Sequence, residues 1–149
     1  MRPVVPLVQA SVAALLLAGC QAMPGEGSMT REEALAALAS TTEAVTGRVG
    51  GGWARRAEPS TMSCGTMGGG SGRRWVDEAS GAVDWPADDA VAAATEALEG
   101  EGLSVSVDAD GDPVTRIALR ATGGARELSL VLSLRSDGVA RLNAESACF

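Results

Sequence analysis

The chain has 149 residues, a formal net charge of −7, and no histidine, lysine or tyrosine. This length corresponds to a single domain, and the acidic balance argues against a nucleic-acid partner, because binding to phosphates needs a basic surface. Without histidine or lysine, serine and cysteine nucleophiles lack their usual bases, and nitrogen-ligated zinc sites are excluded. The core must be built from leucine, valine and alanine, since aromatic residues are few.

The N-terminal segment resembles a bacterial lipoprotein signal. Arg2 precedes a short apolar run that ends in Leu17-Ala18-Gly19-Cys20. The run is shorter than the roughly 20 residues that a membrane-spanning helix needs, so a cleaved signal over residues 1–19 is favoured over a retained span. Acyl chains on Cys20 would then hold the protein at the extracytoplasmic face of the cell membrane. The alternative is an ordinary secreted protein with an unmodified cysteine.

The segment after the signal predicts a tether. Residues 20–29 contain proline, glycine and serine without periodicity, and such a flexible stretch has a root-mean-square span of roughly 15–18 Å. Removal of residues 1–19 leaves eleven arginines and nineteen acidic residues, a charge of −8. Attachment to the membrane therefore depends on the acyl chains rather than on attraction to anionic lipids. Residues 30–149 form the single predicted domain.

Two helices are predicted. Thr30 and Glu33 have the spacing of a capping box and open a first helix that runs to about Thr46, with Gly47 as its end. Asp88 or an immediate neighbour can cap a second helix, which ends at Gly100 or Gly102. The apolar faces of the two helices comprise Ala34, Leu35, Leu38 and Val45, and Val91, Ala94, Thr95 and Leu98.

Strands are predicted elsewhere. In the irregular middle region, Trp53–Arg56 and Arg73–Val76 are two short candidates, and Trp85-Pro86 closes that region. After the second helix the apolar period becomes two, which predicts four half-buried strands joined by turns at Asp110-Gly111, Gly123-Gly124 and Asp137-Gly138. The inward residues are Leu103, Val105 and Val107; Ile117, Leu119 and Ala121; Leu128, Leu130, Leu132 and Leu134; and Ala140, Leu142 and Ala144.

These elements predict an α+β fold. It is a two-layer sandwich in which an antiparallel sheet, with a C-terminal four-strand meander, is covered on one face by the two helices. Cys64 and Cys148 are an even pair outside the cytoplasm and predict a disulfide; free or intermolecular thiols are the alternative. Cys148 continues the inward alternation of Leu142 and Ala144, which predicts that its sulfur faces the core.

Several motifs suggest chemistry but have simpler interpretations. Asp108 to Asp112 superficially resembles a calcium loop, but its glycine comes too early for an EF-hand, and a hairpin turn is favoured. Soft ligands for Cu(I) are present in Met62, Cys64 and Met67. A disulfide at Cys64 would remove the thiolate from this set. The run Gly68 to Arg74 offers amides and guanidiniums, but a phosphate cradle needs a following helix, so a flexible loop is favoured. We therefore expect no metal and no cofactor.

Paired carboxylates are the remaining route to catalysis. A pair of acids can hydrolyse glycosides, but Asp77-Glu78 and Asp88-Asp89 are interpreted more simply as surface charge and as the start of a helix. We therefore expect no enzymatic activity.

The order of these parts resembles small actinobacterial lipoproteins of the LppA type. The resemblance rests on the lipobox, the capped helix, the strand meander and four short motifs, Gly50-Gly51-Gly52-Trp53, Cys64-Gly65, Trp85-Pro86 and Ser146-Ala147-Cys148. The glycine-rich loop after Cys64 departs from it. The group has no established biochemical role, so the resemblance implies a location and no functional residues. We expect a non-enzymatic binding or interaction module of the cell envelope, with an envelope protein as partner. The alternative is a carrier or sensor of a small apolar or cationic ligand held between helices and sheet.

Overall fold

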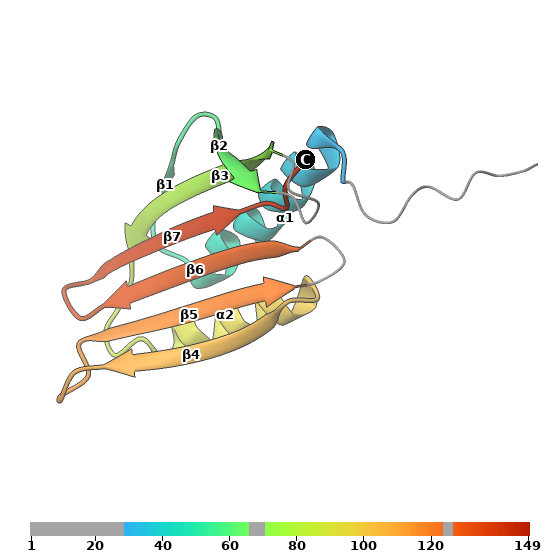
Figure 1. Cartoon of the computed structure of the whole chain (residues 1–149). Coiled ribbons are helices and arrows are strands. Elements are labelled where there is room, and N and C mark those ends of the chain that lie inside the picture. Colours follow the sequence, from blue (N-terminus) through green and yellow to red (C-terminus); the bar gives the residue numbers. More distant parts are fainter. Residues whose placement is uncertain (1–28, 66–70, 124–126) are drawn as a thin grey trace, which may run out of the picture.

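The computed structural model describes residues 29–65, 71–123 and 127–149. In these ranges the chain forms two layers, an antiparallel sheet and a pair of helices behind it (Figure 1). The predicted two-layer α+β sandwich is confirmed. The predicted signal, the predicted lipidation site Cys20 and the tether up to residue 28 lie outside the described residues.

Helix α1 (Arg31–Val49) begins at the predicted capping box. The Glu33 amide donates to the Thr30 hydroxyl at 3.2 Å, and the Thr30 amide donates to the Glu33 carboxylate at 2.8 Å. The predicted end at Gly47 is wrong, because the helix continues to Val49. A glycine inside a helix costs only about 1 kcal/mol, and the first left-handed residue, Gly50 with φ +75°, is where the helix ends.

Helix α2 (Asp88–Gly100) begins and ends where predicted. Its N-cap is Ala87, the immediate neighbour of Asp88, but no side chain makes the expected capping hydrogen bond. Asp88 and Asp89 lie in the first turn, where their negative charges interact favourably with the positive end of the helix dipole. Of the predicted apolar face, Ala94 and Leu98 are buried, and Val91 and Thr95 are half-buried.

The sheet has seven strands in the described residues, in the order β1-β3-β7-β6-β5-β4, with β2 also paired to β3. The strands are β1 (Ala54–Arg55), β2 (Ser60–Gly65), β3 (Ser71–Ala82), β4 (Ser104–Asp110), β5 (Arg116–Gly123), β6 (Leu128–Arg135) and β7 (Val139–Glu145). The last four are the predicted meander. Antiparallel pairing of β3 with β7 joins the N-terminal part of the chain to that meander.

The middle region is more regular than predicted. The segment Trp53–Arg56 contributes only the two residues of β1, and Arg73–Val76 is part of the twelve-residue β3. Strand β2 was not predicted, since its burial follows no alternation and Cys64 is its single buried residue. β1 and β2 both pair with the same side of β3, and β7 pairs with the other side.

The core lies between the helices and the sheet. It is formed chiefly by leucines, with at most 1% of each side chain exposed for Leu38, Leu98, Leu119, Leu130, Leu132 and Leu134. Val107, predicted to face inward, lies on the helix side of the edge strand β4 but is 48% exposed. The space between the helices and the sheet is therefore filled by side chains. In residues 29–65, 71–123 and 127–149, both helices lie on this one face of the sheet (Figure 1).

Candidate functional site: the open face of the sheet

The face of the sheet opposite the helices is called the open face. It is formed by the residues that alternate with the buried leucines, such as Val131 and Ser133 on β6 and Arg141 and Asn143 on β7. In antiparallel sheets such a face is commonly exposed to water. Its side chains are accessible to a ligand, whereas those of the other face are packed in the core.

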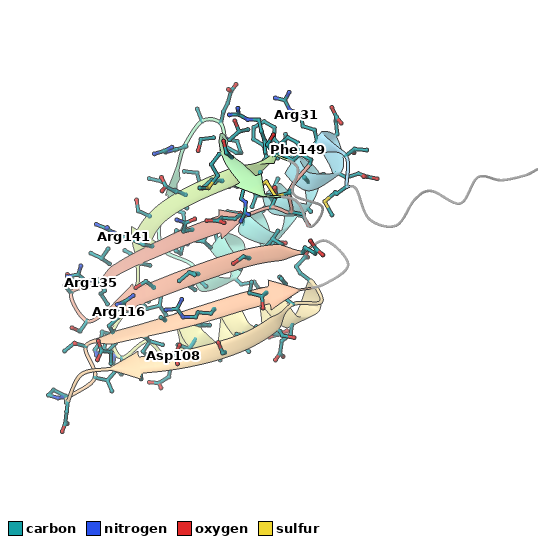
Figure 2. The ribbon with its side chains drawn as sticks, in the orientation of Figure 1. Arg31, Asp108, Arg116, Arg135, Arg141 and Phe149 are labelled. Carbon is teal, nitrogen blue, oxygen red and sulfur yellow. A yellow bond between two sulfur atoms is a disulfide. The ribbon has the colours of Figure 1, made fainter. Side chains whose placement is uncertain are left out.

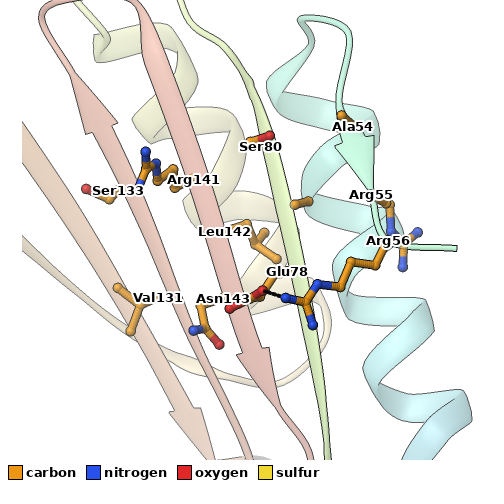
Figure 3. Close-up of a pocket in the computed structure, with 11 residues that line it drawn as sticks. Ala54, Arg55, Arg56, Glu78, Ser80, Val131, Ser133, Arg141, Leu142 and Asn143 are labelled. Atoms are coloured by element: carbon orange, nitrogen blue, oxygen red, sulfur yellow. Dashed lines mark ion pairs between the residues drawn. The ribbon is translucent and has the colours of Figure 1, made fainter. Parts of the chain in front are cut away.

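A first hollow on this face, the β1 hollow, has a volume of about 560 Å³. Figure 3 shows that its side chains come from β1, β3, β7 and β6. Arg56 and Glu78 form an ion pair at 2.9 Å on one side of it, and Val131 and Asn143 lie on the other. The volume lies within the range of about 300–1,000 Å³ that is usual for ligand pockets.

A buried ion pair holds the wall of the β1 hollow in place. The Arg55 Nη2 atom lies 2.6 Å from the Asp77 Oδ2 atom, and Asp77 is 1% exposed. The interpretation of Asp77 as surface charge is therefore wrong. In β3, Asp77 points to the helix side and the next residue, Glu78, to the open face. Strand β1 pairs with β3 over only two residues, and this ion pair adds a side-chain contact between the two strands.

A second hollow, the arginine hollow, has a volume of about 540 Å³ and adjoins the first, since both are lined by Ser133 and Arg141. Three arginines from neighbouring strands line it: Arg116 of β5, Arg135 of β6 and Arg141 of β7. Figure 2 shows all three at the same end of the sheet. Two acids, Asp110 and Asp137, line it as well. The sequence interpretation missed this cluster, because it depends on the register of three strands.

The predicted disulfide between Cys64 and Cys148 is present, with the two Cα atoms 6.1 Å apart. It joins β2 to the C-terminal tail, which pair with opposite sides of β3. The predicted orientation of Cys148 is wrong. Hydrogen bonds pair Ser146 with Trp75 but Phe149 with Arg73, so the tail has one extra residue, as in a β-bulge.

The bulge reverses the alternation of the tail. The Cys148 sulfur lies 3.9 Å from a guanidinium nitrogen of Arg74, whose side chain is on the open face. Phe149 instead lies on the helix side, with its ring 5.8 Å from that of Trp75. The disulfide therefore lies on the open face, at the end of the sheet opposite the arginine hollow (Figure 2).

The other sequence motifs do not come together as sites. Asp108 pairs with Arg120 at 3.5 Å, and Asp110 ends β4 at a turn in which its carbonyl accepts from the Thr115 amide. The described residues contain no group of three cysteines or acids able to hold a metal ion. Met62 is 46% exposed and Cys64 is in the disulfide, while Met67 lies outside the described residues.

The arginines after the glycine run are engaged with neighbouring strands. Arg73 donates to the Thr61 hydroxyl, and Arg74 pairs with Glu145 at 2.7 Å. Residues 68–70 of the run lie outside the described ranges, and its remaining residues belong to the strand β3. The chain therefore continues from the glycines into a strand rather than a helix, as the sequence indicated.

Comparisons with known proteins supply no relative. No family model, no curated protein and no solved structure matches the chain. No helix in the described part of the chain is long and apolar enough to cross a membrane.

Proposed function

We propose that the protein is a non-enzymatic binding module of the cell envelope, anchored through acyl chains on Cys20, and that it binds its partner on the open face of its sheet. The observation that carries the proposal is the pair of adjoining hollows on that face. Each has the size of a ligand pocket. The lipobox that ends in Cys20 supports the location.

The packing of the two layers favours the open face over the space between helices and sheet. Leu119, Leu132 and Leu142 are at most 2% exposed and belong to one continuous core beneath the helices. A ligand held between the layers would have to displace such side chains, at a cost of several kcal/mol for each large cavity opened. The open face needs no such rearrangement.

The placement of the carboxylates supports a binding role rather than catalysis. Asp77 and Glu78 point to opposite faces of β3, and each is paired with a different arginine. Asp88 and Asp89 are exposed in the first turn of α2. Glycoside hydrolysis needs two carboxyl groups that face one bond, and Asp77 and Glu78 do not meet that requirement, because they lie on opposite faces of β3.

The test compares two valines. Val131→Asp places a charge in the β1 hollow, and Val107→Asp makes the same change on the helix side of the edge strand β4, where the valine is already 48% exposed. Each variant, and the wild type, is used to capture partners from detergent-solubilised envelope, after circular dichroism has shown that it is folded.

We expect Val131→Asp to lose a partner that the wild type and Val107→Asp both retain. Equal capture by all three proteins would contradict binding on the open face. Loss of the partner in Val107→Asp alone would indicate that the binding surface is on the helix side.

A further inference from the structure

The arginine hollow brings like charges together in a chain that is acidic overall. Arg116 and Arg135 are directly opposite each other in the register of β5 and β6, on the open face. Arg141 is opposite Ser133, so it lies on the neighbouring strand at the same end. Like charges directly opposite in a sheet are destabilising. An arrangement that carries such a cost is typical of a functional site.

The carboxylates in the hollow do not neutralise the three guanidiniums. Arg135 pairs with Asp137 at 2.7 Å, while Arg116 makes only a hydrogen bond of 3.3 Å to the Ser133 hydroxyl. The Arg141 guanidinium has neither an ion pair nor a hydrogen bond among the described residues. Three arginines against Asp110 and Asp137 leave one positive charge here, whereas the whole chain carries −7.

We propose that the arginine hollow binds a phosphate group of the ligand that the open face takes. This inference rests on the proposed function and names the chemistry that the face recognises. A planar carboxylate can be satisfied by one arginine fork. Guanidiniums that approach from three strands suit a tetrahedral oxyanion, which presents acceptor oxygens in several directions, and the Ser133 and Ser136 hydroxyls add neutral donors.

The position of the hollow favours a soluble phosphate over a lipid headgroup. The described chain begins at Met29, beside Arg31, whose carbonyl accepts from the Trp75 indole. Figure 2 places Arg31 and Phe149 at the end of the sheet opposite the three arginines. From Arg141 to Ser146 the chain covers about 17 Å at the usual rise of a strand. In a domain tethered at its N-terminus, the hollow lies at the end of the sheet away from the point of attachment.

The experiment uses the full processed lipoprotein in phosphatidylcholine nanodiscs and inorganic phosphate as the probe. Binding is measured by calorimetry against sodium chloride at matched ionic strength, because exposed charges are screened by salt. Arg141→Gln removes the unpaired guanidinium. Arg120→Gln is the matched control, since Arg120 is on the open face outside the hollow and pairs with Asp108.

We expect saturable binding in the wild type, about a tenfold weaker affinity in Arg141→Gln, as for the loss of a charge-assisted hydrogen bond, and no change in Arg120→Gln. The absence of saturable binding beyond that of chloride, or an equal loss in both variants, would overturn the proposal. If phosphate fails but partner capture remains sensitive to Val131→Asp, the phosphate site is wrong and the binding face stands.

A second arm distinguishes the sources of phosphate. The same titration is repeated in nanodiscs that contain phosphatidic acid. We expect an unchanged affinity for free phosphate, because the hollow is at the end of the sheet away from the tether. A reduced apparent affinity in these discs would show that a headgroup occupies the hollow and would overturn the assignment to a soluble ligand.

Discussion

Removing the Arg55 guanidinium should release strand β1 and destabilise the whole domain. Arg55→Met keeps much of the apolar stem and leaves Asp77, 1% exposed, without its ion partner. Breaking a buried ion pair from one side costs about 3–5 kcal/mol. The Arg55 side chain is 33% exposed, so solvent screens part of this interaction. We therefore expect a loss of about 2–3 kcal/mol in the free energy of unfolding.

The assay is urea unfolding followed by tryptophan fluorescence and circular dichroism. Arg56→Met is the matched control, because its ion pair with Glu78 is half-exposed on both sides and such pairs contribute about 0–1 kcal/mol. The double variant Arg55→Met/Asp77→Leu should recover much of the loss, since an apolar pair of similar volume can replace a buried ion pair. Equal effects of Arg55→Met and Arg56→Met would refute the buried pair as the attachment of β1.

Three further changes test the anchor, the disulfide and the first helix. Cys20→Ala should release the protein from membranes or block its processing, as judged by fractionation, and a processed variant that stays membrane-bound would contradict lipid anchoring. The double variant Cys64→Ser/Cys148→Ser should lower the free energy of unfolding by about 2–5 kcal/mol. Free thiols found by mass mapping of the unreduced wild type would contradict the disulfide on which this prediction rests. Thr30→Ala should cost about 1 kcal/mol by removing the N-cap hydroxyl, and an unchanged urea midpoint would show that α1 does not depend on its capping box.

The parts of the fold that were predicted correctly are those governed by local patterns. The capping box at Thr30 and Glu33 uses residues three apart, and the strands of the meander alternate with a period of two. A strand such as Leu128–Arg135 has one face in the core, so its apolar residues mark its orientation directly. Strand β2 has no such pattern, because it lies outside the helix-covered core and Cys64 is its one buried residue.

The candidate site was missed because it depends on long-range register. Nothing near Asp77 in the sequence indicates that it is buried, since its partner Arg55 is 22 residues away. The arginine hollow likewise requires that Arg116 and Arg135 fall opposite each other. The predicted orientation of Cys148 was wrong for a related reason. A one-residue bulge after Ser146 reverses the alternation of the side chains, so the periodicity of β7 does not extend to Cys148.

The most direct test of the open face as the binding surface is site-specific photocrosslinking in cells. A photoreactive amino acid replaces Asn143, which is exposed on the open face and lines the β1 hollow, or Glu96, which is exposed on α2. Both positions tolerate a large side chain, since each points into solvent. We predict adducts from position 143 and none from position 96. Adducts from position 96 and none from position 143 would contradict binding on the open face.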